Sequence, residues 1–425
     1  MGSKTEVLDL IENGINYLGR DYENVCDLFA GSATLSGALR NNARVISNDI
    51  HSYSSVFAST YLSNYQWDKY PDIQEICGAA DERTRRFNQY FSEYAGRFSY
   101  DREFTLDELN TYEQEQRDLI NIEGWDVFDQ YYLFAKNYAG TYWSYDQCVA
   151  IDSYRCIIDR YRDDPAYYNL LLTCLIYAMA YNSQSTGHYA QYRIPENDSS
   201  KEDILIYRRK NIKDFFVRKY VELESFLNDN NYYEFETMAL KDTECLARLP
   251  EKTLVYADPP YCFVHYSRFY HILETMVRYD YPELRFKGRY RTDRYQSDYC
   301  IKTEVTDAFC DMFDGVRNSH SDLILSYTNS ETNTIAFEEL LRACCTHFNP
   351  ECNMEEVLPR CLQRGSRFFG NQKKDTVLVL GAEDVPGLEY EISMIKKPYN
   401  HSRMGRKETK SIPVTEVVII SKYVG

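Results

Sequence analysis

The sequence predicts an α/β fold, in which a mainly parallel sheet is interrupted by a mainly helical insertion. Two observations indicate the sheet: residues 24–29 and 253–257 are short apolar runs, and each ends in residues that do not continue a strand. A third observation indicates the insertion. Residues 61–165 have helical periodicity and many tyrosines, and they lack the alternation of strands and helices that precedes them.

The composition limits the class of protein. The chain has 425 residues, which is long enough for two or three domains or for one large domain with an insertion. It is 44% apolar, which is enough for a proper core. No apolar run approaches the roughly 18 residues of a membrane span, and the N-terminus lacks the pattern of a secretory signal. The 13 cysteines include no Cys-x-x-Cys pair. We therefore expect a cytoplasmic protein with reduced thiols, no metal site and no membrane association.

The formal net charge of −17 is unevenly distributed along the chain. Residues 61–130 hold 16 acidic and 7 basic side chains, a net charge of −9. Residues 265–302 and 393–413 are basic, with net charges of +3 and +5. Because an acidic surface repels nucleic acid, nucleic-acid contact is expected at the basic stretches. The acidic region is either a solvated helix face or a candidate surface for a protein partner.

A strand followed by a turn of small residues forms a candidate ligand cradle. The strand is residues 24–29, a helix is predicted over residues 35–39, and the turn between them contains Ala30, Gly31, Ser32 and Ala33. Small residues let the backbone approach a ligand closely. A second strand, residues 44–47, leads to Asp49, which lies eighteen residues after Gly31. An acid at this place commonly accepts hydrogen bonds from ribose hydroxyls, so the pattern predicts a nucleotide-like ligand.

The second apolar run, residues 253–257, is followed by Asp258, Pro259, Pro260 and Tyr261. Proline fixes its own φ and holds the preceding residue extended, and two prolines end a central strand because they donate no ladder hydrogen bond. The tetrapeptide therefore presents a carboxylate, a proline carbonyl and an aromatic ring at the carboxyl end of the strand. Two acceptors and a stacking face suit the exocyclic amino group of a flat base. The plain alternative is a proline turn capped by Asp258, but the full string is rare by chance.

Other segments complete the predicted fold. Helices are predicted over residues 6–18, 166–180 and 203–229, and strands over residues 322–329, 376–380 and 416–420. The polar and aromatic segment 181–195 is predicted to be an exposed loop or hairpin, in which His188 is a loop residue rather than a catalyst. Basic residues alternate with aromatic ones over residues 266–271 and 285–291, a pattern that suits phosphate contact and base stacking.

Together these motifs resemble the Dam-like DNA adenine N6-methyltransferases of the D12 class. The matching segments follow the family's order and span most of the chain: residues 2–4, 27–33, 48–50, 181–189, 256–261 and 325–327. The acidic segment 61–165 has no counterpart that we can name. The resemblance implies a Rossmann-like sheet that binds S-adenosylmethionine, an inserted helical recognition region, and double-stranded DNA as the substrate.

The resemblance also implies roles for individual residues. Lys4 and Asp27 would lie near the methionine end of the cofactor. Asp49, followed by Ile50, would hold the ribose hydroxyls, and Asp242 would meet the adenine amino group. The turn would line the methionine and ribose with Phe29, Ala30, Gly31, Ser32 and Ala33. In the family, the region of Tyr181 and Asn182 is a DNA-contacting hairpin. This region and the basic-aromatic pattern described above together give the expected DNA contacts, which are Tyr181, Asn182, Tyr189, Arg193, Arg268, Lys287, Arg289 and Arg291.

Two departures from the family pattern concern the cofactor. Ala33 stands where the family usually has a second glycine, and no aromatic residue precedes Gly2. Neither departure removes a reacting group.

The implied reaction transfers a methyl group from S-adenosylmethionine to the N6 amino group of an adenine that is flipped out of the duplex. Asp258 and the Pro259 carbonyl would accept hydrogen bonds from that amino group, with the base stacked on Tyr261. The biological context would be restriction–modification or phage defence. N4-cytosine and RNA methylation use the same amino-group chemistry, and a catalytically idle DNA-binding subunit would keep the same fold, so these alternatives stay open.

The expected domain organisation alternates along the chain. The catalytic domain would comprise a cofactor-binding part (residues 1–60), an Asp-Pro-Pro-Tyr part (236–262) and C-terminal strands (321–425). The intervening segments would be an acidic helical insertion (61–165), a DNA-recognition hairpin with helices (166–235) and a basic-aromatic recognition insertion (263–320).

Overall fold

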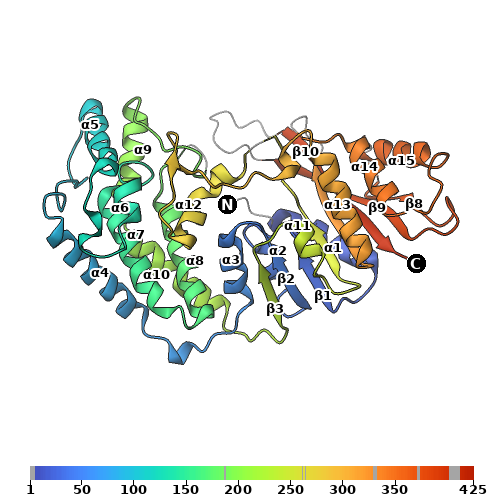
Figure 1. Ribbon diagram of the computed structural model, residues 1–425, viewed down its shortest axis with the longest axis horizontal. Coiled ribbons are helices and arrows are strands. Elements are labelled where there is room, and N and C mark those ends of the chain that lie inside the picture. The colour runs from blue at the N-terminus through green and yellow to red at the C-terminus, as the bar shows by residue number, and fades with distance from the viewer. Residues whose placement is uncertain are drawn as a thin grey trace. The chain divides into compact units, whose positions relative to one another are not determined.

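A computed structural model describes residues 5–185, 188–260, 262–263, 265–328, 333–370, 374–401 and 412–425. The chain forms two compact units, and many of their elements are labelled in Figure 1. The sheet unit comprises Met1–Leu62, Asn231–Tyr266 and Tyr295–Gly425. The helical unit comprises Ser63–Asn230 and Ser267–Arg294, so it is inserted into the sheet unit at two places in the sequence.

An eight-stranded sheet organises the sheet unit, with its strands in the order β3-β2-β1-β4-β7-β10-β9-β8. The first five strands are parallel, and β10, β9 and β8 add an antiparallel edge. The sheet confirms the predicted α/β fold and adds β3 and β9, which the sequence analysis did not predict. The strands are β1 (Asn24–Asp27), β2 (Arg44–Asn48), β3 (Phe235–Met238), β4 (Leu254–Ala257), β7 (Asp322–Thr328), β8 (Thr376–Leu380), β9 (Tyr390–His401) and β10 (Ile412–Tyr423).

Helices cover both faces of this sheet because successive residues of its central strands point into two different apolar layers. Val25, Leu254 and Ile324 pack in one layer with helix α1 (Thr5–Leu18). Their neighbours Cys26 and Val255 pack in the opposite layer. That second layer contains helices α11 (Asp242–Leu246), α13 (Val305–Asn318), α14 (Phe337–His347) and α15 (Leu358–Gly370). Helices α2 (Thr34–Ala38) and α3 (Ser52–Leu62) follow β1 and β2 and pack against each other.

The order of the parallel strands reverses between β1 and β4. The chain winds from β1 to β2 and on to β3, and it then returns to place β4 on the other side of β1, with Asp27 opposite Tyr256. In open α/β sheets, ligands bind outside the carboxyl ends of the strands at such a switch point. The segments that follow β1 and β4 therefore define the candidate site.

The helical unit is built around helices α7 and α8, which are buried over most of their length. Their N-termini are capped by Ser144 and Asp164, which accept hydrogen bonds from the first-turn backbone. No helix in the described part of the chain is long and apolar enough to cross a membrane. The elements are α4 (Ile73–Tyr90), α5 (Leu106–Arg117), α6 (Leu133–Tyr138), α7 (Tyr145–Ile158), α8 (Pro165–Asn182), α9 (Asp198–Arg208), α10 (Ile212–Phe226), α12 (Ser267–Arg278) and the hairpin strands β5 (Leu284–Arg285) and β6 (Tyr290–Arg291). Five 3₁₀ turns complete the described elements of the chain: η1 (Trp67–Lys69), η2 (Asp118–Asn121), η3 (Trp125–Val127), η4 (Asp159–Tyr161) and, in the sheet unit, η5 (Asp298–Cys300).

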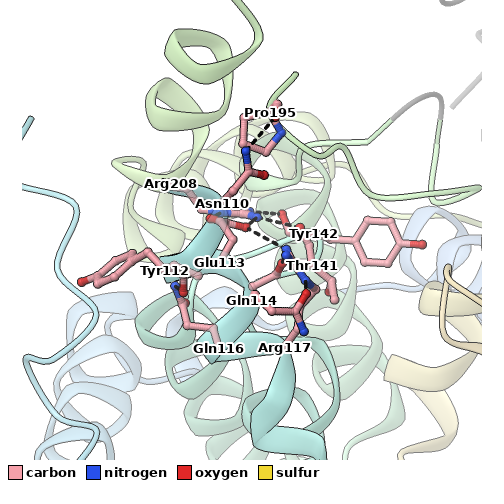
Figure 2. A network of polar contacts seen from close by, with 12 residues as sticks. Asn110, Tyr112, Glu113, Gln114, Gln116, Arg117, Thr141, Tyr142, Pro195 and Arg208 are labelled. Carbon is pink, nitrogen blue, oxygen red and sulfur yellow. Dashed lines mark hydrogen bonds and ion pairs between the residues drawn. The ribbon is translucent and has the colours of Figure 1, made fainter. Parts of the chain in front are cut away.

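A buried ion pair holds the interior of the helical unit together (Figure 2). Arg208 on α9 and Glu113 on α5 are both almost fully buried, and two hydrogen bonds of 2.8 and 2.7 Å join them. Arg208 also donates to the carbonyls of Thr141 and Tyr142, at 2.6 and 2.7 Å, and Tyr100 donates to Glu113 at 2.6 Å. The charges are thus compensated by hydrogen bonds, as burial requires.

The division into units differs from the expected domains at two points. Residues 63–230 form one unit with 267–294 rather than two separate insertions. The segment predicted as a single recognition insertion, 263–320, is divided, because α13 packs in the core of the sheet unit. The predicted helix 203–229 is also two helices, α9 and α10.

Candidate active site

The turn after β1 is held open by backbone geometry. The Leu28 N–H donates to the Tyr256 carbonyl at 2.9 Å, and the Ala30 N–H donates to the Asn48 carbonyl at 2.8 Å. Gly31 has a φ of 55°, and a Cβ placed on it would meet no atom within 4 Å. The turn therefore presents bare backbone beside open space, which is the cradle expected from its small residues.

Ala33 adopts the left-handed conformation that usually favours glycine. Its φ is 55° and its ψ is 28°, and it immediately precedes α2. Alanine tolerates this conformation at a cost of about 1–2 kcal/mol relative to right-handed backbone. Ala33 therefore holds a conformation that glycine would adopt without this cost.

Asp49 joins the turn to the end of β2. One carboxylate oxygen accepts the Gly31 N–H at 3.0 Å, and the other accepts the His51 N–H at 2.9 Å and lies 3.0 Å from its Nδ1. Burial opposes ionisation, but the bonds from His51 and Gly31 outweigh it and lower the pKa of Asp49. Its side chain remains 13% exposed. The result is a fixed carboxylate with an accessible edge.

Asn48 is a site residue that the sequence analysis passed over. Its Nδ2 donates to the carbonyls of Leu28 and Leu240, at 3.1 and 3.2 Å, and its Oδ1 accepts the Leu240 N–H at 3.2 Å. This buried amide ties together the loops that follow β1, β2 and β3. It thereby fixes the position of Asp242, two residues beyond Leu240.

Asp242 lies in a small aromatic corner. The Tyr299 hydroxyl donates to its carboxylate at 2.5 Å, and the Tyr299 ring contacts Phe29 edge-on at 5.4 Å between centroids. Burial raises the pKa of Asp242, partly opposed by the Tyr299 bond. The corner combines an apolar ring face with one hydrogen-bonding acid, a pairing that suits a purine ring and its amino group. Tyr299 belongs to no recognisable sequence motif, and only its contacts with residues distant in the sequence show that it is part of the site.

The remaining residues predicted for the cofactor site differ in accessibility. Phe29, Gly31, Ser32 and Ile50 are half-buried, and Ala30 and Ala33 are buried. Asp27 is fully buried, and it accepts hydrogen bonds from the Ser36 N–H and hydroxyl at 3.2 and 2.8 Å. Asp27 therefore anchors the start of α2 beneath the turn. Lys4 lies outside the described residues.

The segment after β4 is a rigid lip. Asp258 and Pro260 are half-buried and Pro259 is buried, while Tyr261 lies outside the described residues. The Cys300 thiol donates to the Pro260 carbonyl at 3.4 Å. Burial, with smaller contributions from Cys262, Cys300 and Asp258, raises the pKa of Tyr266 well above its usual value. A neutral phenol therefore lies close to the lip.

The short turn η5 connects the two halves of the site. Tyr299 bonds Asp242, and its chain neighbour Cys300 bonds Pro260. Two consecutive residues of η5 therefore link Asp242, which lies beside the cradle, to the lip after β4.

Comparison with known proteins identifies this arrangement. The family model of the D12 class N6 adenine-specific DNA methyltransferases matches residues 1–336. The chain belongs to this family.

Among curated proteins, this D12 family member is 24% identical over 336 residues to modification methylase LlaI of Lactococcus lactis subsp. lactis, covering 77% of the chain and 46% of that protein. It is 24% identical over 365 residues to type II methyltransferase M.FokI of Planomicrobium okeanokoites, covering 83% and 47%. It is 25% identical over 322 residues to type II methyltransferase M.NlaIII of Neisseria lactamica, covering 73% and 77%. The chain thus spans about half the length of the first two relatives.

The predicted DNA contacts of the segment around residues 181–193 fall into two groups. Tyr181 is 46% exposed at the end of α8, and Arg193 is half-buried in an ion pair with Asp203. Asn182 and Tyr189 are buried, and the Asn182 amide donates to the Ala178 carbonyl at 2.7 Å. A buried side chain presents no surface to DNA, which corrects the prediction for these two residues.

The basic-aromatic stretch also differs from the prediction. Arg291 is 2% exposed and pairs with Asp280 and Asp293, at 2.6 and 2.9 Å. Arg289 donates to the backbone carbonyls of Arg117 and Asn137. Arg291 is buried and paired, so it presents no surface to DNA. Arg289 is half-buried with its guanidinium engaged within the helical unit, and its contact with DNA stays a prediction. Two of the predicted cations, Arg268 and Lys287, are exposed.

No group of three or more histidine, cysteine, aspartate or glutamate side chains in the described part of the chain could hold a metal ion. All thirteen cysteines are free thiols, and most of them are buried.

Proposed function

We propose that this protein transfers a methyl group from S-adenosylmethionine to the N6 amino group of adenine in double-stranded DNA, at a specific sequence. The observation that carries the proposal is the position of the Asp258–Pro259 lip. It follows β4, at the switch point where the cradle after β1 also lies. Membership of the D12 family supports the same reaction.

The residues present suit S-adenosylmethionine. The open backbone at Gly31 leaves room for the methionine and ribose, and the ionised Asp49 has an accessible edge for ribose hydroxyls. Asp242 accepts a hydrogen bond from Tyr299, whose ring contacts Phe29, and it would accept a further hydrogen bond from the adenine amino group of the cofactor. The bound cofactor supplies an electrophilic methyl group on a sulfonium centre.

The lip supplies the two acceptors that the target nitrogen needs. An adenine amino nitrogen is a weak nucleophile because its lone pair is delocalised into the ring. Hydrogen bonds from its two N–H groups to the Asp258 carboxylate and the Pro259 carbonyl favour a pyramidal nitrogen with a directed lone pair. Holding that nitrogen in line with the methyl group would supply much of the rate. The prolines fix this geometry before the base arrives.

A base stacked inside a duplex cannot reach such a lip, so the target adenine must leave the stack. We place the DNA contacts on exposed groups of the helical unit, among them Tyr181, Arg268 and Lys287. The acidic residues 61–130 would face away from DNA, toward solvent or a protein partner. The proposed setting is the modification activity of a restriction–modification or phage-defence system in the cytoplasm.

The decisive experiment replaces Asp258. We expect Asp258→Ala to abolish methylation while cofactor affinity changes by no more than a few-fold, because Asp258 addresses the target amino group. Glu251→Ala is the matched control, since Glu251 is an exposed acid at the opposite end of β4. Calorimetry gives the cofactor affinity, and mass spectrometry of digested nucleosides gives the product.

Each product has a separate meaning. N6-methyladenine from the wild type, lost in Asp258→Ala and kept in Glu251→Ala, is the expected result. N4-methylcytosine, methylated RNA or no product from the wild type would each reject the proposal. Full activity of Asp258→Ala would reject the role of the lip.

A further inference from the structure

The β5–β6 hairpin of the helical unit is fastened to its surroundings by buried polar side chains. Arg291 on β6 forms paired hydrogen bonds to Asp280 at 2.6 and 2.8 Å, and it also bonds Asp293. Arg289 donates to the carbonyls of Arg117 and Asn137. A two-stranded hairpin is marginally stable by itself, so these bonds explain how so short a hairpin is held in one orientation.

The backbone of the tip is also anchored. The Tyr142 hydroxyl donates to the Gly288 carbonyl at 3.0 Å, and the Tyr138 hydroxyl donates to the Arg289 carbonyl at 3.2 Å. The Tyr290 hydroxyl donates to the Ala190 carbonyl, in the segment that follows α8. Lys287 lies with its Nζ 5.7 Å from the Tyr192 ring centroid. The hairpin tip therefore lies beside residues 190–192.

This anchored tip presents an aromatic ring to solvent. Phe286 is 74% exposed, and its φ of 64° is unusual for a bulky residue. Its ring centroid lies 6.4 Å from that of Tyr290. Backbone strain of this kind persists only where the surrounding structure imposes it, and it concentrates at binding sites.

Another exposed phenylalanine in the same unit shows what an ordinary surface ring looks like. Phe226 is 64% exposed at the end of α10, where the backbone is helical. Single exposed apolar side chains of this kind are common and need no explanation. Phe286 differs because a strained, many-bonded turn holds it outward beside the exposed Lys287. Arg285, on its other side, is exposed but ion-paired with Glu283 at 2.9 Å.

We propose that Phe286 inserts into the bases of duplex DNA, with Lys287 on the neighbouring phosphate. The inference rests on the proposed function. A lone ring beside an exposed lysine fits a stacked, negatively charged partner, because every base offers a π-face and the phosphates offer charge. A protein partner would instead call for a continuous apolar patch. The anchored hairpin lets the ring enter the stack without first being ordered.

The test uses the full chain and four variants: Phe286→Ala, Phe286→Leu, Phe286→Trp and Phe226→Ala. The probe is a labelled duplex containing a sequence that the wild type methylates. We expect Phe286→Ala to weaken duplex binding by roughly ten- to a hundred-fold, the usual loss when an aromatic stacking partner is removed. Phe286→Leu should bind the duplex about as weakly as Phe286→Ala, because leucine is apolar but does not stack. Phe286→Trp should bind like the wild type, and Phe226→Ala should be unchanged.

Two further measurements separate stacking from a general defect. Cofactor affinity should be the same in all variants, and the tryptophan at position 286 should lose fluorescence when duplex is added. Equal binding by Phe286→Ala and the wild type would overturn the inference. So would equal losses in Phe286→Ala and Phe226→Ala, or unquenched tryptophan.

The outcome is distinguishable from failure of the proposed function. If the wild type methylates DNA and Phe286→Ala has an unchanged KM for DNA, only the inference fails. If the wild type forms no N6-methyladenine, the proposed function fails. Binding to a mixed-sequence duplex then decides the role of Phe286, with the same expected and overturning results.

Discussion

The two units of this protein use buried carboxylates in opposite ways. In the sheet unit, Asp49 is held mainly by the Gly31 N–H and by His51, and its side chain keeps 13% of its surface exposed. In the helical unit, Glu113 is 1% exposed, and both of its oxygens bond Arg208. A carboxylate that keeps part of its surface exposed can still receive a ligand. A carboxylate bonded from all sides can only stabilise the fold.

The basic side chains of the helical unit also divide into buried, paired charges and exposed charges. Three arginines donate hydrogen bonds to carboxylates and carbonyls inside the unit: Arg208, Arg289 and Arg291. Lys287, one residue after Phe286, keeps its charge at the surface. The net charge of a stretch therefore overstates what DNA can contact, because the buried arginines are already paired.

The largest effect of a substitution is expected at the buried ion pair of Arg208 and Glu113. Arg208→Met should lower the free energy of unfolding by about 3–5 kcal/mol, because Glu113 would remain buried without its partner. Replacing both residues, as Glu113→Leu with Arg208→Met, should recover most of that loss. Urea denaturation of the three proteins measures the effect. A cost below about 1 kcal/mol for Arg208→Met would show that the pair is not essential to the interior.

Asp49 should behave as a ligand-binding acid rather than a structural one. Asp49→Ala should weaken S-adenosylmethionine binding by roughly ten- to a hundred-fold, because hydrogen bonds to a charged group contribute about 1.5–3 kcal/mol. Asp21→Ala is the control, since Asp21 is an exposed acid before β1. Calorimetric titration with the cofactor compares both variants with the wild type. Unchanged affinity in Asp49→Ala would place the ribose elsewhere.

The smallest effects are expected in the turn after β1, where Gly31 and Ala33 share a φ of 55°. Gly31→Ala should cost about 1–2 kcal/mol of stability, because it adds a Cβ to left-handed backbone. Ala33→Gly should change stability by less than about 1 kcal/mol, since relief of strain is offset by chain entropy and by a lost buried methyl. Thermal unfolding measures both. Equal effects in the two variants would mean that the turn does not depend on Gly31.

Local chemistry in the sequence was enough to predict several parts of the site. Pro259 and Pro260 restrict the backbone wherever they occur, so the lip after β4 followed from the residues themselves. The small turn around Gly31 and the acid at Asp49 also depend on neighbours in the chain. These features need no distant contact to take their shape.

Only the tertiary structure decided the remaining features, because their partners are far apart in the sequence. Tyr299 meets Asp242 across 57 residues, and Cys300 meets Pro260 across 40. Whether Arg291 faces phosphate or Asp280 depends on how α12 and the hairpin pack, and a sequence shows the same guanidinium in both cases. Long-range packing sets which charges are buried and paired, and so which of them remain available to a ligand.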